Sequence, residues 1–462
     1  MRMRCAFLVL CGFFAGPGAV FAGPFPQQNA GRQDAGPGDG RSQSHYSPPK
    51  WPLPKIDDAR VGSLGIRSVA GRHLTLYTDL PESQAVDELP KVFDAAVPQW
   101  CDYFRIPLRS AEDWRLVGYV IGDKDRFRKS GLLPENLPPF LHGYQRFAEI
   151  WAYEQPSDYY RRHLVLHEGT HAFMHWALGG AGPPWYMEGM AELLATHEWS
   201  GGELRLGVFP VSKQQTPQWG RIKIIQDDVA ANRGKTIKQV TQYDVHAHLQ
   251  VEPYAWCWAT AAFFQGQAAY RPSFQRLSLN VRSRDDDFTR RFAEGLRGGW
   301  GVTNRQWELF VREIDYGYDL EREAIETRPS KPFPGGSLKF ELAADRGWQS
   351  TGLQLAGGRR YRVEASGRFQ LDDQPVVWWS EANGVTIHYV RGFPLGMLLG
   401  AVVDEQAPSA GVESLLHPEP IGTRTDLQPA HGGTLYLRIN DRPSSLRNNA
   451  GRLDVAVQEL PD

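Results

Sequence analysis

The stretch from Arg161 to His175 constrains the fold of this chain more than any other, because histidines recur at positions 163, 167, 171 and 175. Residues four apart lie on one face of a helix, so the spacing predicts a helix with imidazoles along one side. The apolar residues Leu164, Val165, Ala172 and Phe173 would give that helix a buried side that holds it rigid.

Within this helix, His167-Glu168-x-x-His171 has the spacing of a metal site. The two imidazoles can present nitrogen atoms to one cation, and Glu168 would lie beside a metal-activated water as the catalytic base. The alternative is a polar stripe of histidines that binds nothing. His163 and His175 are interpreted as structural, or as part of the wall of the cleft.

A second helix is expected to begin at Pro183-Pro184 and to carry two carboxylates one turn apart, Glu188 and Glu192. Glu188 would complete a site of two histidines and one glutamate, for which zinc is the expected metal. Glu192 could accept the other ring N–H of a ligand histidine, most plausibly His167. Gly189 would remove a side chain where the two helices pack closely.

The run Trp185-x-x-Glu188-Gly189-x-Ala191 resembles the second motif of the gluzincin metallopeptidases, and the strongest likeness is to secreted bacterial proteins of the peptidase MA-like type. The resemblance spans about residues 70–320. It implies that His167, His171 and Glu188 bind zinc and that Glu168 is the base. The chain lacks the Gly-x-Met-Glu-Asn element with which related aminopeptidases hold a free amino terminus, which favours an endopeptidase.

Tyr254 begins the run Tyr254-Ala255-Trp256-Cys257-Trp258, which resembles a later helix of the same proteins. Two interpretations stay open for this tyrosine. It is either a core side chain or a phenol that stabilises the oxyanion of the reaction.

The N-terminus predicts an exported protein. Arg2 and Arg4 precede a short apolar run, and Val20 and Ala22 are small enough for cleavage after Ala22, so residues 1–22 read as a signal peptide. A lipoprotein with Cys11 as the acceptor is the alternative. Residues 23–54, rich in Gly, Pro and Ser, are expected to be a flexible leader. The location is therefore secreted or periplasmic.

Composition excludes some partners. Lys plus Arg number 51 against 53 Asp plus Glu, with the signs interspersed, so no nucleic-acid partner is indicated. No run after the signal is long enough to span a membrane. Removal of the signal leaves Cys101 and Cys257, which could form one disulfide.

Two domains are expected. Strand-like and helical runs alternate over residues 55–328, which predicts an α+β domain of the metallopeptidase type. A linker rich in Pro and Gly follows at 329–336. Residues 337–462 contain short alternating runs and turns, which predict an all-β sandwich.

An oxygen-rich loop of the sandwich is a candidate calcium site. Asp441, Asn448 and Asn449 could converge on a hard cation. The stretch resembles the calcium loop of bacterial calcium-dependent galactose-binding lectins, which adds the carbonyl of Ser445 as a ligand and implies binding of galactose-type glycans. The alternative is a turn that closes the sandwich and binds nothing.

The sequence thus predicts a secreted zinc peptidase that hydrolyses peptide bonds of a peptide or protein substrate, directed to glycans or glycoproteins by its C-terminal domain. Two alternatives remain. One is an inactive peptidase-like scaffold that binds carbohydrate with calcium. The other is a zinc amidase acting on a non-peptide or cell-wall amide.

Overall fold

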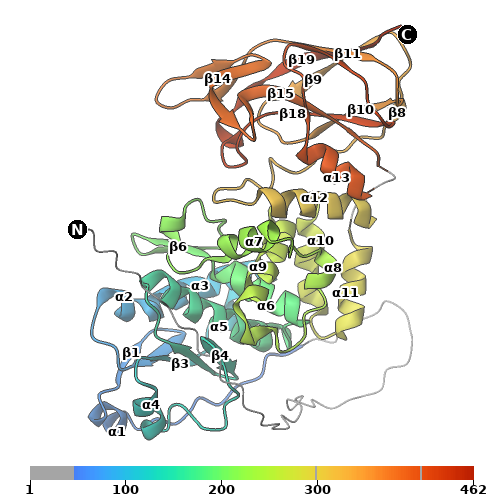
Figure 1. Ribbon diagram of the computed structural model, residues 1–462. Coiled ribbons are helices and arrows are strands. Elements are labelled where there is room, and N and C mark those ends of the chain that lie inside the picture. Colours follow the sequence, from blue (N-terminus) through green and yellow to red (C-terminus); the bar gives the residue numbers. More distant parts are fainter. Residues whose placement is uncertain (1–45, 297–298, 406–407, 462) are drawn as a thin grey trace, which may run out of the picture. The chain divides into compact units, whose positions relative to one another are not determined.

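The computed structural model describes residues 46–461 apart from 297–298 and 406–407. Over these residues helices and several β-sheets are mixed, and strands dominate after residue 330 (Figure 1). The predicted signal peptide and most of the predicted leader lie outside the described residues. The end of that leader is irregular, and its Tyr46 hydroxyl donates to the carbonyl of His175 at 3.3 Å.

A five-stranded sheet forms the first part of the described chain, with the order β1-β2-β3-β5-β4. Strands β2, β3 and β5 are parallel, and the edge strands β1 and β4 run antiparallel to their neighbours. All six residues of the central β3 are buried, as is usual in a parallel sheet. The elements are α1 (Asp58–Ser63), β1 (Arg67–Ala70), β2 (Leu74–Thr78), α2 (Gln84–Asp87), α3 (Leu89–Phe104), β3 (Leu116–Ile121), α4 (Lys124–Ser130), β4 (Gly143–Arg146) and β5 (Glu149–Tyr153).

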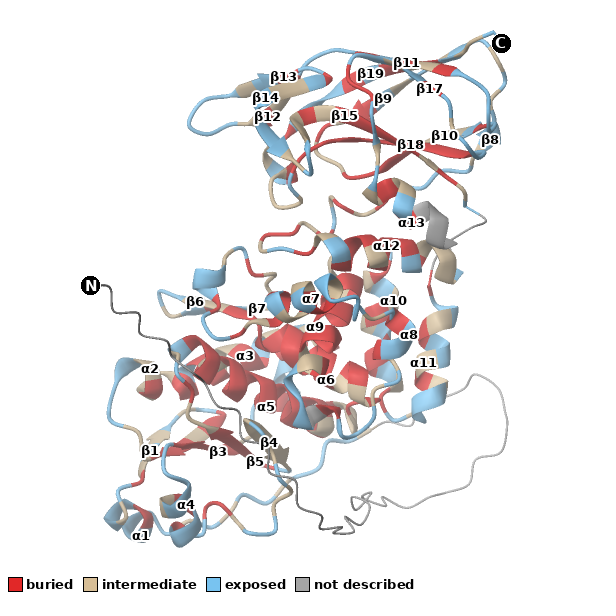
Figure 2. Cartoon of the chain, in the orientation of Figure 1, coloured by how far each residue is buried: buried red, intermediate tan, exposed pale blue. Residues whose placement is uncertain are grey.

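Helices and one short hairpin follow. Helix α5 contacts α3 and the sheet strands β4 and β5, while α6 packs between α5 and α9. Figure 2 shows these three helices, α5, α6 and α9, as the buried centre of this region. The elements are α5 (Asp158–Leu178), α6 (Pro184–Ala195), β6 (His197–Ser200), β7 (Glu203–Leu206), α7 (Arg221–Ala230), α8 (Ile237–Val240), α9 (Val251–Gly266), α10 (Arg271–Gln275), α11 (Asp285–Glu294) and α12 (Gly299–Glu313).

Local sequence explains the bounds of α5. The hydroxyl of Ser157 caps its start by accepting from the N–H of Tyr160 at 3.1 Å, and Gly179 ends it with a left-handed φ of 76°.

Gly189 of α6 allows close packing of two helices, as expected, but the neighbouring helix is not α5. An added Cβ there would lie 2.9 Å from the carbonyl oxygen of Cys257, so the glycine lets α6 pack on α9 rather than on α5.

The C-terminal strands form two sheets whose apolar side chains share one core. The first has the order β14-β15-β18-β10-β8 with β16 beside β15, and the second has the order β13-β12-β19-β11-β17 with β9 beside β19. The predicted linker 329–336 contains β8, which pairs with β10. The elements are β8 (Lys331–Pro332), β9 (Ser337–Ala343), β10 (Gln349–Leu355), β11 (Tyr361–Ser366), β12 (Phe369–Asp372), β13 (Trp378–Ser380), β14 (Asn383–Val390), β15 (Phe393–Val403), α13 (Pro408–Leu416), β16 (Glu419–Pro420), β17 (Arg424–Leu427), β18 (Gly433–Ile439) and β19 (Ala450–Glu459).

A buried charge cluster joins β18 to the segment around α12. The Arg438 guanidinium lies 2.9 Å from a carboxylate oxygen of Glu323 and 3.8 Å from one of Glu313, and it stacks over Trp348. Arg438 and Glu323 are almost fully buried. Since buried charges are costly unless paired, the two parts of the chain stabilise each other's charges.

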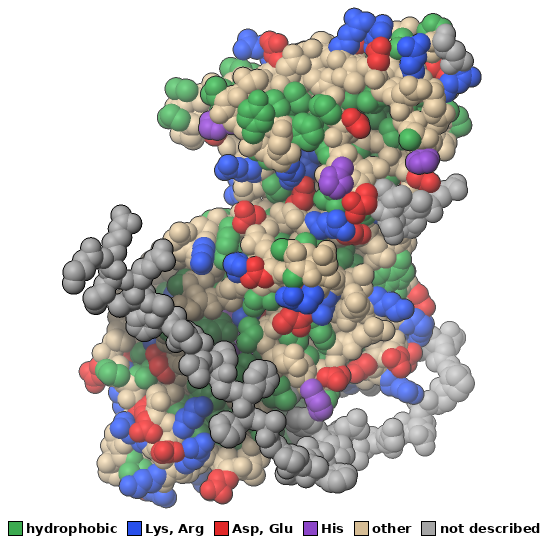
Figure 3. Space-filling view, in the orientation of Figure 1, with side chains coloured by type: hydrophobic (Ala, Val, Ile, Leu, Met, Phe, Trp, Pro, Cys, Tyr) green, Lys and Arg blue, Asp and Glu red, His purple; other side chains and the backbone are tan. Residues whose placement is uncertain are grey.

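Within the described residues no helix is long and apolar enough to cross a membrane. Cys101 and Cys257 are both buried free thiols, so the possible disulfide between them is not formed. Burial raises the pKa of the Cys101 thiol to about 11. On the face shown in Figure 3, basic and acidic side chains are interspersed rather than gathered into a patch of one sign.

Candidate metal centre

Helix α5 supplies two imidazoles to one point. His167 and His171 stand one turn apart and are both buried, and their Nε2 atoms are 3.1 Å apart. The two rings meet edge to face at 84°. The helix therefore directs two nitrogen lone pairs into the same small volume, as the four-residue spacing predicts.

Helix α6 supplies a third donor to the same point. Glu188 Oε2 lies 3.2 Å from Nε2 of His167 and 3.5 Å from Nε2 of His171. Tetrahedral zinc with bonds of about 2.0 to 2.1 Å separates its ligands by about 3.3 to 3.4 Å. The three donor atoms therefore form one face of a tetrahedron of the size that zinc requires, and these residues fit the ion.

Electrostatics favour a cation at this point. Glu188 Oε2 is buried and accepts no hydrogen bond. Burial raises the pKa of Glu188, but His171 and His167 lower it further, to about 2, so the carboxylate is charged. Burial lowers the pKa of His167, yet Glu188 and Glu192 raise it well above its usual value. Two imidazole nitrogens and a charged carboxylate therefore meet at one buried point that favours positive charge, which a proton on His167 or a metal ion can supply.

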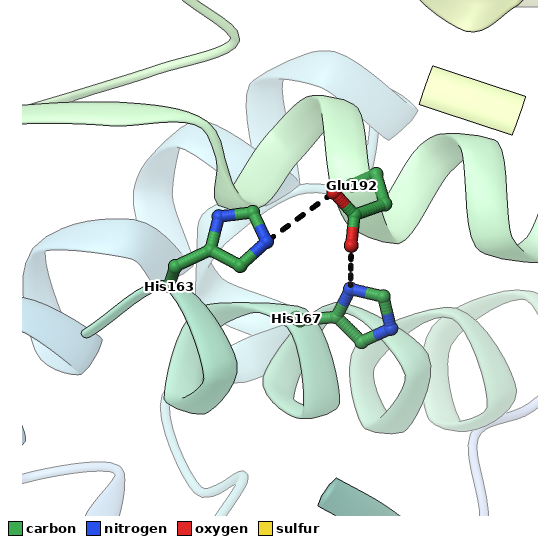
Figure 4. Close-up of side chains that lie close together, drawn as sticks. All are labelled: His163, His167 and Glu192. Carbon is green, nitrogen blue, oxygen red and sulfur yellow. Dashed lines mark ion pairs between the residues drawn. The ribbon is translucent and has the colours of Figure 1, made fainter. Parts of the chain in front are cut away.

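A second group lies on the other side of His167. As Figure 4 shows, His163 and His167 reach from α5 toward the two oxygens of Glu192 on α6. Glu192 Oε2 lies 3.4 Å from Nε2 of His163, and Oε1 lies 3.4 Å from Nδ1 of His167. This arrangement turns Nε2 of His167 toward Glu188, as a carboxylate partner of a ligand histidine does.

Arg221 distinguishes the two groups. Its guanidinium donates to both oxygens of Glu192, at 3.0 and 2.8 Å, and every one of these side chains is buried. Because Arg221 already neutralises Glu192, a second cation beside it would be repelled. The group of His167, His171 and Glu188 is therefore the better metal centre, and Glu192 is its support.

Glu168 lies against the edge strand β4. An added Cβ at Gly143 would lie 2.9 Å from Cδ and 3.0 Å from Cγ of Glu168 and would overlap Oε1. Burial raises the pKa of Glu168 to about 6, against the lowering effect of His167 and His171. Glu168, the predicted base, thus lies against the edge strand β4. Its carboxyl group fits there because residue 143 is a glycine and has no side chain.

Tyr254 reaches the same neighbourhood from α9. Its ring lies 5.7 Å from that of His167, edge to face, and 5.6 Å from the guanidinium carbon of Arg221. Burial raises the pKa of its phenol, and Glu188 and Glu168 raise it further, so the hydroxyl keeps its proton. Its role in stabilising an oxyanion stays a prediction.

Three neighbours of the centre were missed by sequence reasoning: Gly143, His142 and Arg221. His142 precedes β4 and is half-buried, and its pKa is lowered, first by burial and then by the charge of Arg221, against the raising effect of Glu192. None of the three belongs to a periodic motif. The only available signals were a glycine at the start of a short strand and an arginine at the start of α7.

The predicted calcium loop follows β18. Asp441 and Asn449 are buried, and burial raises the pKa of Asp441 to about 6. The side-chain oxygens of Asn448 and Asn449 are buried without a hydrogen-bond donor. The carbonyl of Ser445 accepts from the N–H of Asn448 at 3.1 Å. The loop therefore holds two acceptors in need of a donor or a cation.

No protein-family model matches the chain, and no curated protein matches it. The chain is similar to a solved structure described as "EclA N-terminal domain; PllA-like lectin", with 18% identity and a TM-score of 0.21. The alignment covers 26% of this chain and 95% of that one.

Proposed function

We propose that the chain is an exported, zinc-dependent peptidase of the gluzincin type. The observation that carries this proposal is the triangle of donor atoms from His167, His171 and Glu188, with edges of 3.1, 3.2 and 3.5 Å and Glu168 as neighbour. A zinc ion held there supplies Lewis acidity and a water of lowered pKa. Glu168 takes the proton of the attacking water and delivers it to the leaving amine.

The position of the edge strand β4 favours a polypeptide as the substrate. It is the last strand of its sheet among the described residues, and Gly143 in it lies against Glu168. An extended peptide can add to such an edge through main-chain hydrogen bonds, which would bring a backbone amide beside Glu168. A substrate without an extended peptide backbone could not form these main-chain hydrogen bonds.

The test combines metal analysis with hydrolysis. The purified full chain should contain one zinc ion, and Glu188→Ala should lose it. The wild type should cleave casein or a peptide library, a chelator should stop cleavage, and Glu168→Gln should keep the metal but lose at least about 10²-fold in turnover. Undiminished hydrolysis by Glu168→Gln would remove that residue from the mechanism.

The two alternatives predict different results in the same assays. A cell-wall amidase would release fragments from peptidoglycan and leave casein intact. An inactive scaffold would bind zinc and cleave neither substrate. A chain without zinc whose hydrolysis is insensitive to chelators would refute the metal centre itself.

The loop of Asp441, Ser445, Asn448 and Asn449 supports a second function, calcium-dependent binding of galactose-type glycans. The supporting observation is the pair of buried asparagine oxygens without hydrogen-bond donors, since calcium takes such oxygens as ligands. Calorimetry on the full chain loaded with zinc should show calcium binding that Asp441→Asn abolishes, and galactose binding only with calcium. No heat on adding calcium to the wild type would leave a turn that binds nothing.

A further inference from the structure

A cavity of about 650 Å³ lies away from the metal centre. It is lined by the end of α7, the loop before α8, one side of α12 and Val412 of α13. The indole N–H of Trp307 donates to the carbonyl of Lys235 at 2.7 Å, which fixes the loop against α12. The volume lies within the range of small-molecule sites.

Arg305 of α12 lines this cavity, and its surroundings are unusual. It is only 6% exposed, yet its guanidinium makes no hydrogen bond or ion pair with another described residue. The other buried arginines in the described chain, Arg161, Arg221 and Arg438, each pair with a carboxylate. Arg305 is thus the exception among them.

The neighbouring cations are already neutralised. Lys235 pairs with Glu252 at 2.9 Å, and Arg312 pairs with Glu308 at 2.7 Å and with Glu413 at 3.2 Å. Arg312 thus faces two carboxylates, so the charges around the cavity balance when Arg305 is included, but no described carboxylate forms an ion pair with the Arg305 guanidinium itself. The guanidinium nitrogens of Arg305 are not among the fully enclosed polar atoms without a partner, so they remain accessible from the cavity. A carboxylate that enters the cavity can therefore pair with this guanidinium.

The chemistry of the lining defines that ligand. A guanidinium is a planar fork that binds a carboxylate through two parallel hydrogen bonds. Trp307, Val229, Val311 and Val412 provide apolar surface around the remaining space. An inorganic ion would fill only a small part of 650 Å³, whereas an organic acid would use both the charge and the apolar walls.

We propose that this cavity is a binding site for a small organic carboxylate with an apolar group, and that Arg305 holds its carboxylate. The proposal does not depend on the peptidase function. The site lies on α12 and its neighbours, and none of its lining residues belongs to the metal centre.

Calorimetry on the full chain at low salt tests the site with N-acetyl-L-phenylalanine as the probe. N-acetyl-L-phenylalaninamide, which differs by the loss of the charge, should give no heat. Arg305→Met should abolish binding of the acid, while Arg128→Met, which removes an exposed arginine paired with Asp125, should not. Inorganic phosphate should bind more weakly than the acid, and tighter binding of phosphate would overturn the assigned class.

Two further measurements distinguish a ligand site at Arg305 from binding at the metal centre and from a purely structural arginine. Binding should persist in Glu188→Ala, because a carboxylate held by the metal centre would be lost in that variant. If the Glu188→Ala variant fails to bind the probe while the Arg305→Met variant still binds it, the proposal is overturned. Without ligand, Arg305→Met should melt at or above the wild-type temperature, because it removes an unpaired buried charge. A lower melting temperature, with no probe binding to the wild type at millimolar concentration, would make Arg305 a structural residue only.

Discussion

Replacing Gly143 by alanine tests how closely the sheet edge confines Glu168. The substitution adds one methyl group, and the backbone at Gly143 does not have a positive φ, so alanine is not strained there. The new Cβ would stand 2.9 Å from Cδ and 3.0 Å from Cγ of Glu168. The whole carboxyl group would have to move, since its stem and its head are both too close.

The size of the movement gives the expected loss. Carbon atoms pack at about 3.5 to 4.0 Å, so the carboxyl group must shift by about 1 Å. A misplacement of about 1 Å between reacting groups can cost about 10²-fold in rate. Gly143→Ala should therefore approach the turnover of Glu168→Gln. The metal ligands should keep their ion, because the three atoms nearest to the added Cβ all belong to Glu168.

The assay is peptide hydrolysis at saturating zinc, with the metal content measured on the same samples. Gly62→Ala is the matched control, because an added Cβ at Gly62 meets no atom within 4 Å. Turnover of Gly143→Ala within twofold of the wild type, at equal metal content, would refute the confinement of Glu168 by β4. Loss of the metal together with activity would mean that the substitution disturbs α5 instead.

Three more results are expected. Arg221→Met should lower the free energy of unfolding by about 3 to 5 kcal/mol, because it leaves the buried Glu192 unpaired, and adding Glu192→Gln should restore part of it in urea titrations. His197 is held neutral, since burial lowers its pKa to about 3 while its Nδ1 faces the carbonyl of Ala195 at 2.8 Å and its Nε2 accepts from Arg162 at 3.2 Å. The unfolded state binds this proton more readily, so stability should be complete above about pH 6.5 and fall by about 1.4 kcal/mol for each unit as the pH drops toward 3. His197→Gln should flatten that slope, and an equally steep profile would contradict it. A chelator should lower the melting temperature of the wild type by about 5 °C or more and excess zinc should restore it, whereas an unchanged curve would contradict a tightly held ion.

The expected metal ligands could be predicted from sequence because the residues on each of the two helices are close together in the chain. One helical turn relates His167 to His171, and one turn relates Glu188 to Glu192, so periodicity alone brings each pair to one face. The strand runs at β2 and β3 were also recognisable, since apolar and β-branched residues dominate them.

The surroundings of the centre could not be predicted in this way. Gly143 and Arg221 come from a sheet edge and from the start of α7, and only tertiary packing brings them to α5 and α6. The same holds for Gly189, whose close neighbour proved to be α9. A glycine in a sequence does not reveal which side chain needs the space it leaves.

The segments rich in Pro and Gly illustrate the limits of composition. Residues 329–336 have the composition of a linker, yet two of them pair with β10, because an extended proline-containing strand can occupy a sheet edge. The end of the predicted leader likewise reaches α5 through Tyr46. Composition indicates where regular helices and strands are expected to end, but it does not show whether the backbone there forms hydrogen bonds with another strand.

The pairing of Arg438 with Glu323 and Glu313 has a practical consequence for dissecting this protein. If the chain were cut at residue 336, Glu313 and Glu323 would lie on one fragment and Arg438 on the other, and each would lose its ion-pair partner. Each fragment would also expose the apolar side chains that the two parts bury together, among them Leu309, Trp348 and Leu399. Exposed apolar patches of this kind favour aggregation. Ligands of the sandwich are therefore best sought with an intact polypeptide, and inactivating substitutions are better tools than truncation for assigning activities to either half.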